Sequence, residues 1–260
     1  MHKFKIIGIS IFVSVLVLAL IWLVQPEPSE VMDIPEVEYS DDPVPNFAEI
    51  SNVKEKKKAF FDYLKPAIAS QNEYILKVRQ NIQAWRAKYV AGEELTEKQQ
   101  RELAFLLDEY RVDEDQPELV IFDKLLAKVD IIPAELVLIQ SANESAWGTS
   151  RFARKGYNFF GLWCFVENCG FVPKRRNDGA SHEVAKFDNL SSAMYSYMRN
   201  LNSHPAYKEL RTIRQELREN QQKIAATRLV EGLSKYSERG EEYIEELKQM
   251  IRINRELIST

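Results

Sequence analysis

The sequence predicts an α+β fold that is mostly helical, with one small β-hairpin and an additional membrane-spanning helix at the N-terminus. Three observations support this prediction. Apolar residues recur with helical spacing over most of residues 53–258. One turn sequence with β-prone residues on either side interrupts that pattern between Gly161 and Phe187. An uncharged run at Ile6–Val24 precedes all of these segments.

Residues 1–25 are predicted to be a transmembrane signal anchor. Residues 6–24 are 19 consecutive uncharged residues, or about 28 Å of helix at ~1.5 Å per residue, close to the ~30 Å of a hydrocarbon core. Lys3 and Lys5 precede this run and acidic residues follow it, so we expect a cytoplasmic N-terminus and a periplasmic body on the inner membrane. A cleaved signal peptide is the alternative, but its apolar run is usually ~7 to 15 residues long.

Residues 26–50 are predicted to be an acidic, proline-rich linker. They contain five prolines, eight acidic residues and no Lys or Arg. Such a composition cannot bury a core, so the segment should stay extended. A spacer of this kind would let an anchored protein reach a polymer layer above the membrane.

Residues 51–115 are predicted to be a helical lead-in to a domain that spans residues 116–260. Thr96 fits a helix N-cap, with Gln99 completing a capping box. Trp85 is interpreted as a core residue rather than a sugar-stacking one. The helices expected in this half of the chain cover residues 54–70, 72–91, 96–111 and 117–129.

Residues 134–147 are predicted to form a buried helix that carries an acid at its end. Apolar residues surround most of its circumference, so it should lie inside the domain. Glu144 shares a stripe with Val137 and Gln140 and precedes Trp147 by one turn. Loss of water raises the pKa of a carboxyl because the charged form loses more solvation, and such an acid can protonate a sugar leaving group. Glu144 is therefore a candidate general acid, although a Glu near a helix end is more often simply solvated.

The predicted hairpin pairs residues 171–172 with residues 183–187 around the turn at 177–179. Alternation would place Glu183, Ala185 and Phe187 on one face. Further helices are expected over residues 190–201, 206–219, 223–233 and 241–258. A basic row on one of them is interpreted as a solvated, salt-bridged face, and consists of Arg211, Arg214 and Arg218.

Two runs carry a family resemblance. The sequence Glu-Ser-Ala-Trp-Gly-Thr-Ser at 144–150, followed by Tyr-Asn-Phe-Phe-Gly-Leu at 157–162, resembles the signature of the bacterial glucosaminidase family of cell-wall hydrolases. The chain departs from that signature at Ala146, where the family prefers Gly. Residues 182–207 resemble the Bax branch of this family. The resemblance covers about residues 115–260 and implies a lysozyme-like α+β fold and hydrolysis at N-acetylglucosamine.

The resemblance also implies roles for further residues. Glu183 best matches a second acid on the hairpin, which would act as base or nucleophile; the fallbacks are Glu167, Asp178 and Asp188. If no second carboxylate is close, the acetamido group of the substrate could act as the nucleophile. Tyr197 matches a tyrosine thought to line the cleft, where its hydroxyl could orient water or the acetamido group. Substrate-binding positions are expected at Trp147, Asn158 and Phe160; Asn158 could instead cap a turn.

Cys164 and Cys169 are the two cysteines of the chain. A disulfide across this short loop is plausible outside the cytoplasm, and free thiols are the alternative. A zinc site with His182 lacks a second His at the required spacing, because His204 is too distant in sequence. We therefore expect neither a metal nor a cofactor.

Composition limits the class of partner. The chain has 260 residues, 45% of them hydrophobic, and a formal net charge of −4, which argues against nucleic acid. The expected function is a membrane-anchored peptidoglycan hydrolase whose partners are glycan strands and the inner membrane. The alternatives are a lytic transglycosylase and a non-catalytic wall-binding or scaffold module.

Overall fold

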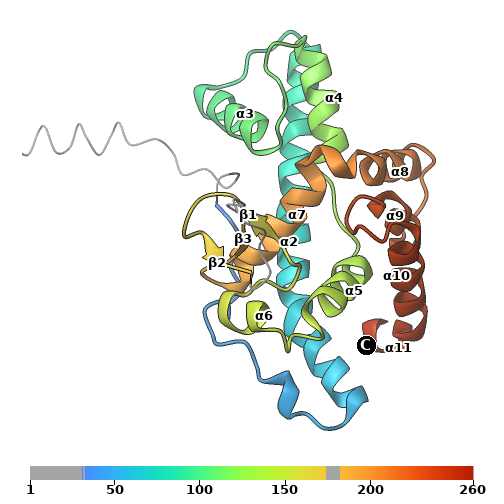
Figure 1. Cartoon of the computed structure of the whole chain (residues 1–260). Coiled ribbons are helices and arrows are strands. Elements are labelled where there is room, and N and C mark those ends of the chain that lie inside the picture. Colours follow the sequence, from blue (N-terminus) through green and yellow to red (C-terminus); the bar gives the residue numbers. More distant parts are fainter. Residues whose placement is uncertain (1–30, 32, 174–181, 260) are drawn as a thin grey trace, which may run out of the picture.

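Helix α2 (Val53–Val90) runs through the middle of the molecule in the computed structural model, which describes residues 31, 33–173 and 182–259 (Figure 1). The prediction of two helices separated at Gln71 is wrong, because α2 is continuous over 38 residues. Its apolar stripe extends on both sides of Gln71, which is itself buried. Asn72 does not cap a new helix, since its side chain bonds both the N–H and the carbonyl of Ile132. Packing against α4 (Glu118–Lys128), α5 (Ala134–Ser145) and α7 (Leu190–Ser203) therefore outweighs the local signal for a break.

The predicted capping box is confirmed in α3 (Glu97–Glu109), where Thr96 and Gln99 bond reciprocally. Helix α4 (Glu118–Lys128) follows and packs on α2 and α8. Trp85 is buried in the core, as predicted.

The tether prediction is wrong for residues 33–50, which are packed against the domain. Ser40 is buried and shares a hydrogen bond of 2.8 Å with Ser191 of α7. A short 3₁₀ helix, η1 (Phe47–Glu49), places the Phe47 ring 5.3 Å from that of Phe60. Specific hydrogen bonds and one buried aromatic outweigh the acidic composition here. Residues 26–30, residue 32 and the predicted anchor at 1–25 lie outside the described residues, and no helix among the described residues is long and apolar enough to cross a membrane.

Helix α5 (Ala134–Ser145) is buried almost all round, as predicted, but ends two residues early. Ala146 and Trp147 adopt left-handed conformations, with φ of 50° and 58°. This geometry favours glycine, so it gives a physical reason for the Gly of the family signature at position 146. Helix α6 (Arg151–Gly156) follows.

The β-region is a three-stranded antiparallel sheet rather than a single hairpin. Its order is β1 (Trp163–Cys164), β3 (Glu183–Ala185) and β2 (Gly170–Phe171). The pairing of Phe171 with Val184 agrees with the predicted hairpin. Strand β1 was missed because two residues carry no detectable period. The predicted turn at 177–179 lies outside the described residues.

The C-terminal part returns to helices. The first of them, which begins at Leu190, packs on α2, and those from residue 208 onward lie on the opposite side of α2 from the sheet in Figure 1. The predicted helix over 241–258 is interrupted at Asn254, whose side chain bonds the carbonyl of Met250. The predicted helix over 223–233 begins only at Ala226. The elements are α7 (Leu190–Ser203), η2 (Pro205–Tyr207), α8 (Lys208–Glu219), α9 (Ala226–Leu229), η3 (Val230–Leu233), α10 (Glu241–Ile253) and α11 (Arg255–Ser259).

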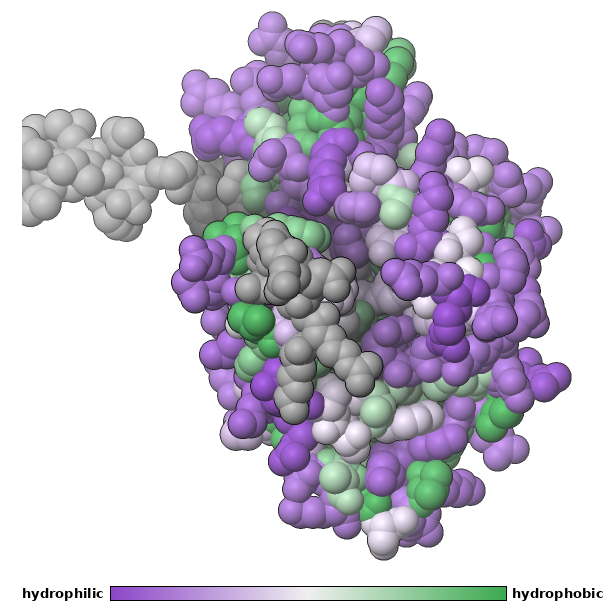
Figure 2. All heavy atoms as spheres, viewed as in Figure 1, coloured by the Kyte–Doolittle hydropathy of each residue, from purple (hydrophilic) through white to green (hydrophobic). Residues whose placement is uncertain are grey.

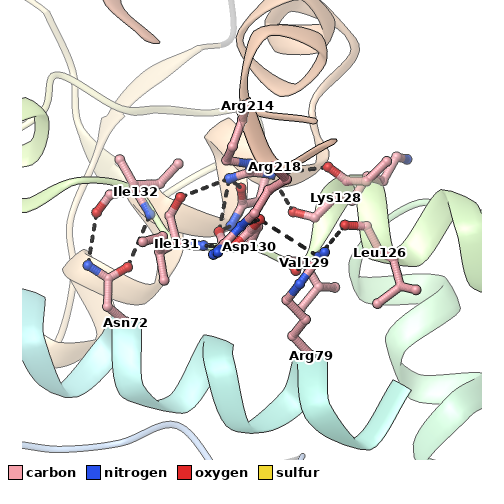
Figure 3. A network of polar contacts seen from close by, with 12 residues as sticks. Asn72, Arg79, Leu126, Lys128, Val129, Asp130, Ile131, Ile132, Arg214 and Arg218 are labelled. Atoms are coloured by element: carbon pink, nitrogen blue, oxygen red, sulfur yellow. Dashed lines mark hydrogen bonds and ion pairs between the residues drawn. The ribbon is translucent and has the colours of Figure 1, made fainter. Parts of the chain in front are cut away.

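The interpretation of the α8 arginines as a solvated, salt-bridged face is wrong for Arg211 and Arg214 and holds for Arg218, which is exposed and forms an ion pair with Asp130. Arg211 and Arg214 are buried, and Arg214 is only 1% exposed. The guanidinium of Arg214 binds four main-chain carbonyls of residues 127–131 and the Asn202 side chain (Figure 3). Arg218 forms two hydrogen bonds with the buried carboxylate of Asp130. Arg214 thus satisfies four carbonyls at and just after the end of α4, and Arg79 of α2 binds those of Leu126 and Val129.

Candidate active site

An open cleft of about 720 Å³ lies between the sheet, the end of α5 and the C-terminal half of α7. Glu144 and Phe160 line it, with Tyr207 and Tyr236. Trp163 and Phe165 of the sheet region also line it and are 50% and 75% exposed. The face drawn in Figure 2 is mostly hydrophilic, and hydrophobic side chains reach it beside the sheet.

Glu144 occupies the last turn of α5 and is half-buried. Its Oε1 accepts a hydrogen bond of 2.8 Å from the Tyr243 hydroxyl. A Cβ atom on Gly161 would lie 3.8 Å from Oε2, so the second oxygen faces the cleft-lining turn at Gly161. Burial raises the pKa of Glu144 above its ordinary value, although hydrogen bonds from Tyr243 and Asn143 and the charge of Arg239 oppose the rise. Glu144 is thus partly buried at the cleft, and its role as a general acid stays a prediction.

A chain of hydrogen bonds ends on Glu144. The Tyr197 hydroxyl donates to Oε1 of Gln140 at 2.5 Å, and Nε2 of Gln140 donates to the Tyr243 hydroxyl at 3.0 Å. Tyr243 then donates its only hydroxyl hydrogen to Oε1 of Glu144. Because Oε1 is already an acceptor, a proton on a neutral Glu144 resides on Oε2, on the side of Gly161. The chain thus fixes which oxygen can deliver a proton to a ligand.

Tyr243 and Tyr236 are site residues that the sequence analysis missed. Tyr236 lines the cleft and donates a hydrogen bond of 2.8 Å to the carbonyl of Phe160. Its ring is nearly parallel to that of Tyr243, at 4° and 5.7 Å between centroids. Both tyrosines are about 90 residues or more from Glu144 in sequence, and no local pattern connects them to it.

Tyr197 lies behind the cleft rather than in its wall. It is fully buried and stacks on Phe160, with centroids 3.7 Å apart and planes at 11°. Burial raises the pKa of Tyr197 well above its ordinary value, so the hydroxyl stays neutral and acts as a donor. Phe160 does line the cleft, as predicted, but its exposed fraction is only 1%. Tyr197 therefore supports Phe160 and Gln140 instead of touching a ligand.

Asn158 and Trp147 also contribute to the framework and are not among the residues that line the cleft. Asn158 is buried, and all the hydrogen bonds of its side chain are to the main chain of residues 160, 162 and 185. This is the turn-capping alternative considered from the sequence. Trp147 packs against Phe60 and Phe61, with centroids 5.9 and 5.4 Å away.

Glu183 is buried in β3, and its carboxylate holds the loop at residues 164–169. It accepts hydrogen bonds from the N–H groups of Asn168 at 3.2 Å and Gly170 at 2.8 Å. The same loop is closed by a disulfide between Cys164 and Cys169, so the thiols are not free to act as metal ligands. Glu183 is not among the residues that line the cleft. The structure thus gives Glu183 a positioning role for the loop.

Two of the fallback acids, Glu167 and Asp188, lie outside the cleft lining. Both are exposed, and Asp178 lies outside the described residues. Among the residues that the structure describes, Glu144 is the one carboxylate in the cleft lining.

Comparisons with known proteins show the family of this chain. The sequence model of the family described as mannosyl-glycoprotein endo-beta-N-acetylglucosaminidase matches residues 120–256. The chain belongs to the glucosaminidase family. Within it, Protein bax of Escherichia coli (strain K12) is 32% identical over 205 residues, which are 78% of this chain and 72% of that protein. No solved structure matches the chain. Glu144, Phe160 and Tyr243 all lie in the part shared with other glucosaminidases.

Proposed function

We propose that this glucosaminidase hydrolyses glycosidic bonds of peptidoglycan at N-acetylglucosamine, with Glu144 as the general acid. The observation that carries the proposal is the half-buried Glu144 carboxyl, whose Oε2 faces the cleft while Oε1 is bound by Tyr243. The raised pKa keeps more of this acid protonated near neutral pH than an exposed glutamic acid would be. Family membership supports the class of substrate.

The proposed hydrolysis does not require a second carboxylate in the cleft. In a substrate-assisted reaction, the acetamido oxygen of the substrate attacks the anomeric carbon while Glu144 gives its proton to the leaving oxygen. Water then opens the resulting ring, with Glu144 taking a proton back. This route is favoured because Glu183 is bound to two main-chain N–H groups. For Glu183 to act as base or nucleophile, the disulfide loop would have to move.

Product analysis tests the proposed bond and chemistry. The full chain is incubated with purified peptidoglycan, and the soluble fragments are analysed by mass spectrometry. We expect fragments with a reducing N-acetylglucosamine end. Anhydro-muramyl ends would instead support the lytic transglycosylase, in which the sugar's own hydroxyl attacks. Binding without any fragments would support the scaffold module.

Replacing Tyr243 by Phe should shift the alkaline limb of the kcat/KM profile to higher pH. In the unchanged protein, the hydrogen bond from Tyr243 favours the charged form of Glu144 and lowers its pKa. Removing the Tyr243 hydroxyl therefore raises the pKa of Glu144. The protonated acid then persists to higher pH. The measurement is kcat/KM against pH, which reports the free enzyme. Tyr236→Phe is the matched control, since that hydroxyl bonds the Phe160 carbonyl instead; an equal shift in both variants would contradict the assignment.

The proposed location is the periplasmic side of the inner membrane, because the predicted anchor at residues 1–25 would leave the body outside the cytoplasm. The Cys164–Cys169 disulfide is consistent with an oxidising compartment.

A further inference from the structure

Two arginines and a histidine line one end of the cleft. Arg111 comes from the turn that ends α3, and Arg199 and His204 come from the end of α7. Arg111 lies before residues 120–256 and so outside the match to the family model. The helical lead-in therefore adds a charged residue to a cleft that is otherwise built from the family domain.

The positive charge at this end is only partly neutralised. Arg199 pairs with Glu109 at 2.5 Å, and the same carboxylate accepts a hydrogen bond from Tyr195. The Lys128 ammonium donates to the carbonyls of Tyr110 and Arg111. The carbonyls of Leu201 and His204 are the acceptors for Arg211. Among the described residues, Glu109 is thus the one carboxylate in ion-pair contact with these cations.

Burial, and after it the neighbouring positive charge, lowers the pKa of two groups near this end of the cleft. The pKa of Lys128 is lowered to about 8 by burial and by the charges of Arg211, Arg111 and Lys124. The pKa of His204 is lowered by burial and then by Arg111 and Arg211, so the ring is neutral at pH 7. Its Nδ1 accepts the N–H of Ala206, which leaves the proton on Nε2. This end of the cleft therefore offers hydrogen-bond donors and unpaired positive charge to a ligand.

We propose that Arg111 and Arg199 bind a carboxylate carried by the glycan beside the bond that is cleaved. A guanidinium pair suits a carboxylate because it donates several parallel N–H groups. In peptidoglycan, this carboxylate belongs either to the lactyl ether of a sugar without peptide or to a stem peptide. The inference rests on the proposed function and deepens it, because it predicts a preference for acid-bearing strands over neutral N-acetylglucosamine polymers.

The test compares three substrates: peptide-bearing glycan, glycan stripped of peptide, and a neutral chitin oligosaccharide. Arg111→Asn removes the charge and keeps a residue that tolerates the φ of 54° at this position. We compare kcat/KM on an acid-bearing substrate with kcat/KM on the chitin oligosaccharide. The ratio of the two should fall about 10- to 100-fold in this variant, because KM for the acid-bearing substrate rises. Arg111→Lys should recover part of the loss. Arg101→Asn, which removes a half-exposed α3 arginine outside the cleft lining, should leave the ratio unchanged.

The pattern across the two acid-bearing substrates identifies the carboxylate. A fall confined to stripped glycan assigns the lactyl group, and a fall confined to peptide-bearing glycan assigns the stem peptide. An unchanged ratio in Arg111→Asn would overturn the inference and leave the proposed function intact.

Direct binding separates this inference from the cleavage chemistry. Calorimetric titration of the full chain carrying Glu144→Gln with stripped and peptide-bearing glycan fragments requires no turnover. Addition of Arg111→Asn should weaken the binding of at least one of these fragments about 10- to 100-fold, and increasing salt should weaken binding less in that variant. Equal affinity with and without Arg111 for both fragments would overturn the inference even if no substrate were cleaved.

Discussion

Replacing Glu144 by Gln is expected to lower kcat on peptidoglycan by about 10²- to 10⁴-fold, the usual contribution of a positioned general acid. Gln has the shape of the protonated acid but no transferable proton. Its carbonyl oxygen can still accept the hydrogen bond from Tyr243, so the chain from Tyr197 through Gln140 stays intact. The measurement is kcat from the release of reducing ends at saturating substrate.

The same substitution should not destabilise the fold at neutral pH. The pKa of Glu144 is raised in the folded protein, so the folded state binds more protons than the unfolded state between the unfolded and folded pKa values. Stability therefore falls as pH rises through this interval, and the charged carboxyl remains a cost above it. Gln removes that cost. Thermal unfolding at pH 7 should show an equal or higher Tm for Glu144→Gln than for the unchanged protein.

Glu135→Gln provides a matched control on the same helix. Glu135 is in the first turn of α5 and does not line the cleft. This variant should retain full activity. A Glu144→Gln protein that digests peptidoglycan at the normal rate would refute Glu144 as the acid. Loss of both activity and stability would indicate a mainly structural role.

The partial burial of Glu144 could be predicted from the sequence because neighbours on its own helix create its environment. The apolar residues of α5 bury the helix, and helical spacing places Gln140 one turn below Glu144. Both properties follow from local periodicity. The early end of α5 could not be predicted, because Ala146 and Trp147 adopt left-handed conformations that depend on the packing of the following turn.

The partners of Glu144 could not be predicted in this way. Tyr243 reaches the carboxyl from α10, 99 residues further along the chain, and the hydrophobic pattern of α10 shows only that Tyr243 faces inward. The family resemblance identified Tyr197 and Asn158 as residues of the site, but it did not indicate what their side chains bind. Their hydrogen bonds show that they hold Gln140 and the turn before β1.

Charged segments were the least predictable from sequence. The acidic residues of 33–50 indicated a free tether, yet Ser40 and Phe47 dock that segment on the domain. Arg214 was assigned to a solvated face because acidic residues surround it on α8. The carbonyls at and just after the end of α4 reverse that assignment, because Arg214 reaches four of them from α8, while Arg79 reaches two others from α2. The composition of α8 does not reveal that carbonyls on another helix will accept hydrogen bonds from Arg214.

Arg214→Met should cost about 3–5 kcal/mol in the free energy of unfolding, the usual penalty for removing one partner of a buried charged network. Met fills much of the space of the side chain but donates no hydrogen bonds. The carbonyls of residues 127, 128, 130 and 131 and the side chain of Asn202 would lose their bonds to the guanidinium. Asp130 would also lose a charge that helps to keep its pKa low against the effect of burial.

Thermal unfolding of the full chain measures this cost. At ~2–4 °C per kcal/mol for a protein of this size, Tm should fall by about 6–20 °C. Arg214→Lys should lie between Arg214→Met and the unchanged protein, because one ammonium keeps the charge but reaches fewer acceptors. Arg252→Met removes an exposed arginine of α10 and should change stability by less than about 0.5 kcal/mol. If Arg214→Met were as stable as Arg252→Met, Arg214 would not be what joins the end of α4 to α8. The carbonyls of residues 127, 128 and 131 would then have to find water as their donor, while Asn202 still serves that of Asp130.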